Sequence, residues 1–494
     1  MENLISFALF VSFLVLVYTQ WKKQRRGKMP PGPRKLPIIG NLLHITGPVL
    51  PHRALRDLAR KYGGLMSLQI GEISAVVVSS PDMAKEFLRT HDLAFATRAE
   101  TLAGSILLYN NSDIVLGPYG DYWRQMRKIC ITELLNPRLV RSFSSIRHDE
   151  IHRLLADVRS SAGRPFNVSE RIFLFTSSII CRAAFGEVFD GREQFIQQTK
   201  DISVLTGSFD FADMFPSWKA LHPLFGNKSE ILKTHRKTDS IIESIINDHR
   251  NKLESGTGED CIIDVLLKLM DSGNLQVPIT HDNIKAIIID MFGAGSETST
   301  TTSMWAMSEM MKNPRVLAKA QAEVREVFKG KEMLEESDVE QLPYLKTVVK
   351  ETLRCHPPTP LIATRECREE TVINGGYTIP VKTKVMVNAY ALATDPQYWE
   401  EPERFIPERF EDNGVDFNGS HFQYVPFGAG RRICPGLAFG FANTISPLAH
   451  LLYNFDWKLP EGVTAETLDM TEMLGLAVAR KNDLILIPSI PSLS

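Results

Sequence analysis

The segment Phe427-Gly428-Ala429-Gly430-Arg431-Arg432-Ile433-Cys434-Pro435-Gly436 constrains this chain more than any other. Its one cysteine lies among glycines and arginines, a setting that favours the thiolate, the form of cysteine that binds metal. Gly430 and Gly436 permit backbone turns that direct amides towards the sulfur. Pro435 begins a helix predicted over Gly436–Asn454, and a helix N-terminus favours an adjacent anion. Because no second cysteine follows at CxxC spacing, the segment indicates a single axial metal ligand.

Three other interpretations of this segment stay open at this point. Cys434 could be buried and inert, or it could be a nucleophile that needs a histidine partner elsewhere in the chain. The glycines could form a phosphate-binding loop, since Gly428-Ala429-Gly430 begins like a dinucleotide fingerprint. Ile433, however, occupies the position of the third glycine, and no βαβ pattern surrounds it.

Composition narrows the class of protein. The chain has 494 residues, of which 44% are hydrophobic, and this excludes a wholly disordered protein. Lys and Arg number 56 against 58 Asp and Glu, so the net charge is −2. This balance argues against a nucleic-acid partner. The six cysteines are too few and too scattered for a disulfide scaffold.

Residues 1–21 are predicted to form a membrane anchor. Leu4–Tyr18 is apolar and uncharged, and Trp21 suits the headgroup level of a bilayer. The basic cluster from Lys22 to Lys28 follows the apolar run, which favours an uncleaved anchor over a signal peptide. It also predicts that the N-terminus lies outside and the bulk of the chain in the cytosol.

Residues 22–40 are basic and then proline-rich, with Pro30-Pro31-Gly32-Pro33 at the centre. Prolines forbid helix continuation, so we expect a stiff linker; a polyproline ligand for a recognition domain is the alternative. Residues 41–494 contain no low-complexity tract, repeat or second linker, and we expect a single domain there.

Periodicity within this domain predicts a mainly α fold with a small β part. Helices are expected at Ile262–Met270, Ile284–Met311 and Pro314–Phe328. Short strands are expected at Leu65–Ile70, Ala75–Val78, Val372–Ile373, Val385–Val387 and Leu484–Ile487.

The segment Ala294-Gly295-Ser296-Glu297-Thr298-Ser299 lies inside the longest of these predicted helices. Gly293 and Gly295 each cost about 1 kcal/mol there relative to alanine. Small residues beside hydroxyls suit a local opening, where a side chain or water enters the hydrogen-bond ladder. A Ser/Thr-rich helix surface is the alternative.

The segment 427–436 matches the haem-binding signature of the cytochrome P-450 family, F-x-x-G-x-R-x-C-x-G. Further motifs that resemble the family occur in its order: Trp123–Arg127 (W-x-x-x-R), Ala294–Ser299, Glu351–Arg354 (E-x-x-R), Arg365 and Phe405–Phe410. The resemblance covers essentially the whole chain. It is closest to plant microsomal enzymes that oxidise terpenoids and other specialised metabolites.

The resemblance implies a cytochrome P-450 fold with an N-terminal membrane-anchor helix and a bound haem b (iron protoporphyrin IX). Cys434 would ligate the iron, with Phe427 and Arg432 beside it. Haem propionates would be bound by Trp123, Arg127 and Arg365. Thr298 would guide protons to dioxygen, with Glu297 as the adjacent acid.

The E-x-x-R motif implies a structural network. Glu351, Arg354 and Arg409 would together lock the region around the cysteine, and Arg404 is the less favoured third member. An i,i+3 pair on an exposed helix would contribute only about 0.2–0.5 kcal/mol.

The implied activity is that of a monooxygenase that inserts one oxygen atom of O2 into a hydrophobic small molecule. Thiolate ligation favours O–O cleavage. Electrons would come from NADPH through NADPH–cytochrome P-450 reductase, at the endoplasmic reticulum membrane with lipid around the anchor. A sesquiterpene or diterpene is the expected substrate; an alkaloid or phenolic is the alternative.

Two classes outside this family are weighed against it. A membrane-tethered binding protein would explain the anchor but not the Cys434 signature. A secreted disulfide protein would need paired cysteines, and the sequons at Asn110, Asn167, Asn227 and Asn418 would then matter.

The resemblance also implies where the substrate pocket lies. It would use the segments Thr101–Gly117, Thr206–Pro216, Ile287–Thr301, Pro360–Thr364 and Met473–Val478. Their apolar side chains suit a bulky apolar ligand: Ile106, Leu107, Leu108, Phe209, Phe211, Met214, Phe215, Leu361, Ile362, Leu474 and Leu476.

Overall fold

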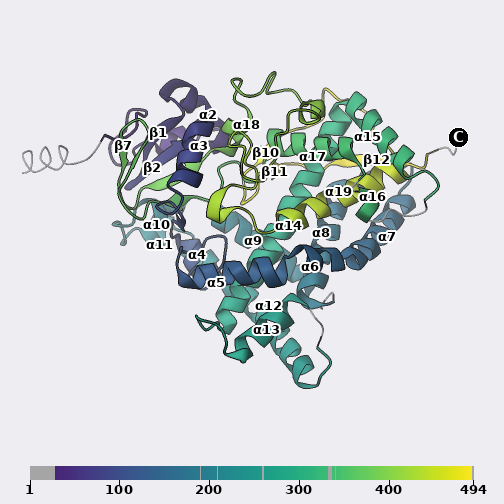
Figure 1. Cartoon of the computed structure of the whole chain (residues 1–494), viewed down its shortest axis with the longest axis horizontal. Coiled ribbons are helices and arrows are strands. Elements are labelled where there is room, and N and C mark those ends of the chain that lie inside the picture. The colour runs from purple at the N-terminus through teal and green to yellow at the C-terminus, as the bar shows by residue number, and fades with distance from the viewer. Residues whose placement is uncertain are drawn as a thin grey trace, which may run out of the picture.

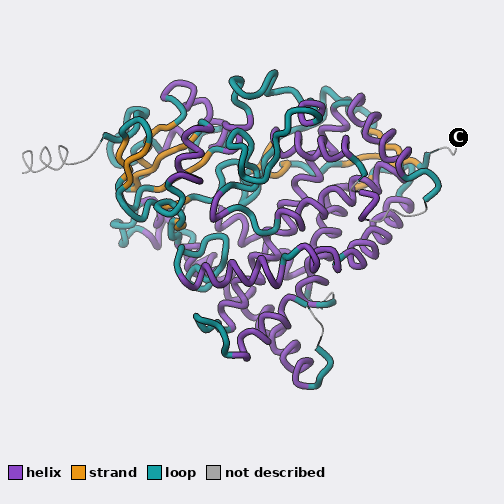
Figure 2. Tube along the Cα trace, viewed as in Figure 1, coloured by secondary structure: helices purple, strands orange, loops and turns teal. Residues whose placement is uncertain are grey.

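The computed structural model describes residues 28–187, 189, 191–207, 210–258, 261–331, 336–339 and 341–491. Many of the strands gather at one end of the molecule, further short strands lie at the centre and near the C-terminus, and helices make up most of the rest (Figure 2). The predicted mainly α fold with a small β part is therefore confirmed. The predicted anchor, residues 1–21, lies outside the described residues. Among the helices that are described, none is long and apolar enough to span a bilayer.

The helices are as follows: α2 (Pro51–Tyr62), α3 (Pro81–Lys85), α4 (Leu102–Leu107), α5 (Asp121–Ile129), α6 (Pro137–Ser142), α7 (Ser144–Ser160), α8 (Val168–Phe185), α9 (Arg192–Gly207), α10 (Phe211–Met214), α11 (His222–Phe225), α12 (Lys228–Glu254), α13 (Ile262–Ser272), α14 (His281–Lys312), α15 (Pro314–Val327), α16 (Glu336–Val339), α17 (Pro343–Cys355), α18 (Ala389–Ala393) and α19 (Leu437–Asn454). Short 3-10 or π turns are η1 (Leu42–His44), η2 (Glu86–Thr90), η3 (Cys130–Leu134), η4 (Pro407–Phe410) and η5 (Gly430–Arg432).

The main sheet has the strand order β1-β2-β8-β5-β3, formed by β1 (Leu65–Ile70), β2 (Ile73–Val78), β8 (Lys384–Val387), β5 (Arg365–Glu366) and β3 (Thr97–Arg98). The β2–β8 pair is parallel and the others are antiparallel. Smaller sheets pair β6 (Thr371–Ile373) with β7 (Tyr377–Ile379), β10 (Glu472–Met473) with β11 (Ala479–Arg480), and β12 (Ile485–Ser489) with both β4 (Phe166–Asn167) and β9 (Asp456–Lys458). All four predicted helices and all five predicted strands match elements whose ends differ by at most three residues.

Helix α14 runs through the middle of the helical part and packs against α8, α17 and α19 (Figure 1). It is apolar on most sides because neighbours surround it, as expected of a buried helix. Thr280 and Asn283 form a capping box at its N-terminus, which satisfies backbone N–H groups that would otherwise lack partners. This helix therefore gives the interior a rigid axis.

The glycines of α14 have a packing reason that the sequence did not reveal. A Cβ at Gly295 would lie 2.6 Å from Cδ1 of Ile180 on α8, so a larger residue would require the Ile180 side chain to move. The helix is continuous through this segment. Thr298 Oγ1 donates to the Ala294 carbonyl at 2.6 Å, so a side chain does enter the ladder, but without interrupting the helix.

The proline-rich stretch is part of the folded unit and not a spacer free of contacts. Ser67 on β1 donates its backbone N–H to the Pro31 carbonyl at 2.8 Å and its hydroxyl to the Pro30 carbonyl at 2.7 Å. Gly40 also bridges to Ile70 at the other end of the strand. These contacts attach the predicted linker to the main sheet over residues 30–40.

The Glu351–Arg354–Arg409 network forms as predicted. Both residues of the i,i+3 pair have fully buried side chains, with Arg354 Nε 2.8 Å from Glu351 Oε2, and Arg409 Nε 3.0 Å from Glu351 Oε1. Arg354 also donates to the carbonyls of Ala393 and Pro402. The Arg404 side chain instead pairs with Glu401 at the surface. The network thus joins α17 to η4 and to the chain segment before η4.

Removing Arg354 tests how strongly this network supports the fold. Arg354→Ala removes the bidentate partner of Glu351 and leaves a buried carboxylate with less compensation. The free energy of unfolding should therefore fall by about 3–5 kcal/mol. The matched control Arg404→Ala removes an exposed pair and should change it by less than about 1 kcal/mol. Urea unfolding followed by circular dichroism measures both. Equal losses in the two variants would contradict the proposed importance of the buried pair.

Candidate haem and substrate site

Cys434 lies between η5 and α19, on the wall of an internal cavity that we call the thiol cavity. Its backbone N–H donates to the Phe427 carbonyl at 2.9 Å, which closes the loop around the sulfur. Gly430 has φ +70°, and a Cβ there would collide with the Leu88 carbonyl. Gly436 has an ordinary φ of −90°, so the expected special turn at this residue is wrong. A side chain at Gly436 would instead approach the Cys434 sulfur, since its Cβ would lie 4.0 Å away.

The protein places the Cys434 thiol in a dry setting. Burial raises its pKa, and the Gly436 N–H and the charge of Arg127 offset this only in part. The adjacent arginines do not point at the sulfur: Arg431 pairs with Asp92, and Arg432 donates to backbone carbonyls. The expectation that the flanking arginines favour the thiolate is therefore wrong in this geometry. A metal ion at the sulfur would supply the missing stabilisation, because metal coordination deprotonates a thiol.

Cys434 and Thr298 line the same cavity from different elements. Cys434, Phe427 and Pro435 come from the loop before α19, whereas Ala294 and Thr298 come from α14. The cavity measures about 240 Å³, and its remaining wall is mostly apolar. The structure therefore brings together the predicted residues Cys434, Phe427 and Thr298.

A cluster of three arginines, two of them buried and one half-buried, lines the edge of the thiol cavity. Arg98, Arg127 and Arg432 all line it. Arg432 donates to the carbonyls of Ala96 (2.8 Å) and Gly117 (2.6 Å), Arg98 to that of Val115 (2.9 Å), and Arg127 to that of Ile433. Each guanidinium thus bonds to neutral carbonyls, although arginine pairs best with anions.

In this cluster burial and mutual repulsion outweigh the attraction of the nearby acids Asp92 and Asp113. Burial and then the neighbouring charge of Arg365 lower the pKa of Arg432 to about 9. Burial followed by the charges of Arg432 and Arg365 lowers the pKa of Arg98 well below its usual value. A ligand carrying carboxylates at this edge would relieve both effects. The two propionates and the iron of haem fit this arrangement of buried cations, apolar walls and thiol.

The other two predicted propionate ligands lie behind the cavity wall. The Trp123 indole N–H donates to the Ile114 carbonyl at 3.0 Å, and the Arg432 guanidinium lies 3.9 Å from the centre of its six-membered-ring face. Arg365 pairs with Asp92 at 3.0 Å and donates to the Ala429 carbonyl at 3.0 Å. These contacts make Trp123 and Arg365 supports of Arg432 and of the cysteine loop.

Glu297 points away from Thr298. Its carboxylate accepts a hydrogen bond from the Ser203 hydroxyl of α9 and interacts with the Ala477 N–H of the β10–β11 turn. Burial raises its pKa, while Ser203, Ala477 and the charge of Lys200 act in the opposite direction. Sequence reasoning predicted an acid beside Thr298, but the structure brings this one to α9 instead.

A pair of buried carboxyl groups was missed by sequence reasoning. Asp290 Oδ2, one helical turn before Ala294, accepts from the Ile114 N–H at 2.7 Å and the Val115 N–H at 3.2 Å. Burial raises the pKa of Asp290 well above its usual value, and the charge of Asp113 raises it further. Burial raises the pKa of Asp113 to about 6. The raised pKa favours the protonated form of Asp290, and the same carboxyl group anchors the loop whose carbonyls bind Arg432 and Trp123.

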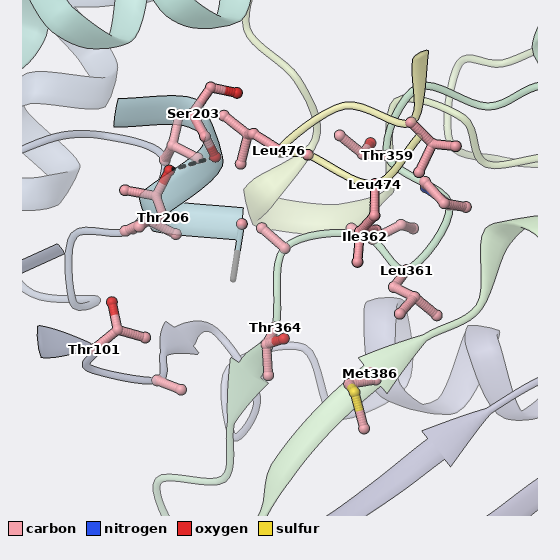
Figure 3. Close-up of a pocket in the computed structure, with 18 of the residues that line it drawn as sticks. Thr101, Ser203, Thr206, Thr359, Leu361, Ile362, Thr364, Met386, Leu474 and Leu476 are labelled. Atoms are coloured by element: carbon pink, nitrogen blue, oxygen red, sulfur yellow. Dashed lines mark hydrogen bonds between the residues drawn. The ribbon is translucent and has the colours of Figure 1, made fainter. Parts of the chain in front are cut away.

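A second cavity of about 330 Å³, the substrate cavity, adjoins the first. Both cavities share Ala294, Thr298, Ile362 and Ala363, so the two spaces meet at α14. Figure 3 shows hydroxyl groups of Thr101, Ser203, Thr206 and Thr364 spaced among apolar side chains that include Leu361, Leu474 and Leu476. The wall is mainly apolar and carries a few scattered hydroxyls.

The predicted pocket side chains divide into three groups. Those that line the cavity are Leu108, Met214, Leu361, Ile362, Leu474 and Leu476. Those outside its wall are Ile106, Leu107, Phe211 and Phe215. Phe209 lies outside the described residues.

A buried thiol across a cavity from a helix hydroxyl, with a cationic edge and an adjoining apolar space, defines a haem-thiolate oxygenase. Residues 30–487 match the family model described as cytochrome P-450. The chain is 60% identical to premnaspirodiene oxygenase of Hyoscyamus muticus, over 98% of this chain and 97% of that one. It is 56% identical to 5-epiaristolochene 1,3-dihydroxylase of Nicotiana tabacum, again over 98% and 97%. A zebrafish cytochrome P-450 structure with progesterone superposes with a TM-score of 0.78 at 23% identity, covering 89% of this chain and all of that one.

The chain belongs to the cytochrome P-450 family. It is a haem-dependent monooxygenase that takes electrons from NADPH through a reductase and uses O2 on hydrophobic substrates. The alternatives of a binding protein, a phosphate-binding loop and a secreted disulfide protein are excluded. Consistent with this, no disulfide joins the six cysteines, all of which lie in the described part of the chain.

Replacing Asp290 tests whether its carboxyl group is neutral. Both Asp113 and Asp290 have raised folded-state pKa values, so the folded pair keeps protons that the unfolded chain releases above about pH 4. This pair therefore lowers stability as the pH rises from 4 to 7. In Asp290→Asn, the amide oxygen can still accept hydrogen bonds from the Ile114 and Val115 N–H groups. The decrease in the free energy of unfolding between pH 4 and 7 should be smaller by about 1–2 kcal/mol.

Urea unfolding at several pH values measures this slope, with the exposed Asp282→Asn of the same helix as the control. An unchanged slope in Asp290→Asn would show that Asp290 is ionised near neutral pH. A slope equally altered in Asp282→Asn would remove the special role of the pair.

Proposed function

We propose that this enzyme inserts oxygen into a terpenoid hydrocarbon, with a sesquiterpene as the favoured substrate. The observation that carries the proposal is the apolar substrate cavity that meets the thiol cavity at Ala294 and Thr298. Two relatives that match nearly the whole chain are named for sesquiterpene oxidation, which supports the same substrate class.

The distribution of charge argues against an alkaloid. A cationic amine would need an ionised carboxylate in the cavity wall, and Asp213 is one acid that lines it. Burial raises the pKa of Asp213, its Oδ1 accepts from the Leu102 N–H at 2.8 Å, and the nearby charge of Lys384 opposes a second cation. A neutral ligand therefore fits better. A phenolic remains the second candidate, because the wall hydroxyls can bind its oxygen.

The haem is assigned to the thiol cavity by the chemistry of its wall. Cys434 would ligate the iron, Arg98, Arg127 and Arg432 would bind the propionates, and Phe427 would contact the ring. Trp123 and Arg365 would hold this set in place through Arg432 and Asp92. When bound, a thiolate-ligated haem supplies O–O bond cleavage.

The residues of α14 control water and protons around the reacting carbon. Ala294 leaves space for the substrate between the two cavities, while Thr298 Oγ1 faces that space and donates to the Ala294 carbonyl. This fixed hydroxyl can accept a proton from one side and pass it on to the other. Glu297 can join the relay only after it releases Ser203, so we assign it the slower role of resupplying protons.

The cellular setting follows from the N-terminal sequence. We propose that residues 1–21 anchor the protein in the endoplasmic reticulum membrane by one pass, with lipid around the anchor and the catalytic domain in the cytoplasm. NADPH–cytochrome P-450 reductase is the proposed electron donor. The basic residues that follow the anchor support this orientation.

Filling the junction of the cavities tests the substrate class. In Ala294→Leu, the sesquiterpene concentration needed for a half-maximal spectral shift should rise at least about tenfold, because the larger side chain overfills the space. The exposed Val204→Leu on α9 is the control and should bind like wild type. Titration of the purified holoenzyme with sesquiterpene, alkaloid and phenolic probes gives the readout. Binding of only the alkaloid would contradict the terpenoid proposal.

Removing the Thr298 hydroxyl tests the proton path. Thr298→Val keeps the shape but loses the donor, so product formation should fall about 100-fold, the lower end of what a positioned proton donor contributes. Thr298→Ser keeps a hydroxyl and should retain most activity. The measurement is product and hydrogen peroxide formed per NADPH consumed. Equal product yield in Thr298→Val and wild type would rule out the assigned role.

A further inference from the structure

Three side chains of different ligand chemistry meet where α12 ends and α13 begins, far along the chain from Cys434. His249 lies in the last turns of α12, Cys261 precedes α13, and Asp264 lies in its first turn. His249 Nδ1 is 2.8 Å from Asp264 Oδ1 and 3.8 Å from Cys261 Sγ. One ligand atom from each residue lies within 4.8 Å of the others. Both helices lie at the lower edge of the molecule in Figure 1, away from the main sheet.

This cluster is buried, and one of its oxygens lacks a partner. The relative exposures are 3% for His249, 5% for Cys261 and 0% for Asp264. Among the residues that the structure describes, no donor lies within hydrogen-bonding distance of Asp264 Oδ2. A Cβ at Gly258 would lie 3.3 Å from this oxygen, so a glycine here keeps the space beside the carboxylate open.

The chemistry of the three groups suits zinc. Zinc takes thiolate, imidazole and carboxylate ligands at about 2.0–2.3 Å in a tetrahedron, so ligand atoms stand about 3.3–3.8 Å apart. The 3.8 Å between Cys261 Sγ and His249 Nδ1 already falls in this range. The 2.8 Å between His249 Nδ1 and Asp264 Oδ1 would have to lengthen by about 0.5 Å to reach it. One thiolate and one carboxylate with a neutral imidazole also balance the two charges of the ion, as burial requires.

We propose that His249, Cys261 and Asp264 bind a zinc ion, with solvent in the fourth coordination position. The ion would clip the end of α12 to the start of α13. Ile262, between two of the ligands, lines the thiol cavity, so the clip would also fix one residue of that wall. A simple histidine–aspartate hydrogen bond is the competing explanation. That hydrogen bond involves Asp264 Oδ1 and leaves Asp264 Oδ2 unexplained.

The test uses the full-length holoenzyme. After exposure to micromolar zinc chloride and dialysis, metal analysis should find one zinc per haem. Zinc-edge X-ray absorption should show one sulfur neighbour, which the iron of the haem does not obscure. Cys261→Ser and Asp264→Asn should retain less than a tenth of that zinc. The controls Cys367→Ser, a buried cysteine elsewhere, and Asp271→Asn, an exposed acid on α13, should retain all of it.

Wild-type protein that retains no zinc would overturn the proposal. Zinc retained equally by all variants would also overturn it, because the metal would then be an adventitious ion only. If Cys261→Ser or Asp264→Asn fails to fold, the wild-type spectrum still decides. A sulfur neighbour supports the site, and a shell of nitrogen and oxygen alone refutes it.

Discussion

Three guanidinium groups, two buried and one half-buried, beside a half-buried thiol on the same cavity wall are the constraint on which this structure depends. Arg98, Arg127 and Arg432 bond to backbone carbonyls and repel one another, while burial opposes the charge of the Cys434 sulfur. In the protein alone, both the arginine charges and a Cys434 thiolate are therefore unfavourable. A dianionic, iron-containing ring satisfies both, which couples cofactor binding to the stability of the fold.

The rest of the fold holds the walls of that cavity at fixed positions. Helix α14 provides one wall and α19 begins at the other, and the two helices pack directly together. The Glu351–Arg354–Arg409 network fixes the segment that leads to the cysteine loop. Asp290, whose pKa is raised by burial, anchors the loop that carries the carbonyl partners of Arg432. A substrate cavity can therefore open on one side of α14 without loosening the cofactor side.

Sequence patterns predicted the parts of the structure that consecutive residues form. The cysteine loop, the apolar run of α14 and the strands β1 and β2 each leave a continuous signature, and each was found at its expected place. Arg98 leaves no such signature in the sequence. It reaches the site only because β3 pairs with β5, and this pairing places Arg98 opposite Arg365, 267 residues later in the chain. Asp113 and Asp290 meet in the same long-range way. The direction of Glu297 depends on Ser203 of another helix, so a motif could give its identity but not its contact.

The most direct measurement of the central claim is the iron-edge X-ray absorption of the purified holoenzyme. The account predicts one sulfur neighbour of iron, lost in Cys434→His although haem is retained. It also predicts weaker haem binding in Arg98→Leu than in the exposed control Arg89→Leu. An iron shell of nitrogen and oxygen only in the wild-type protein would contradict the account.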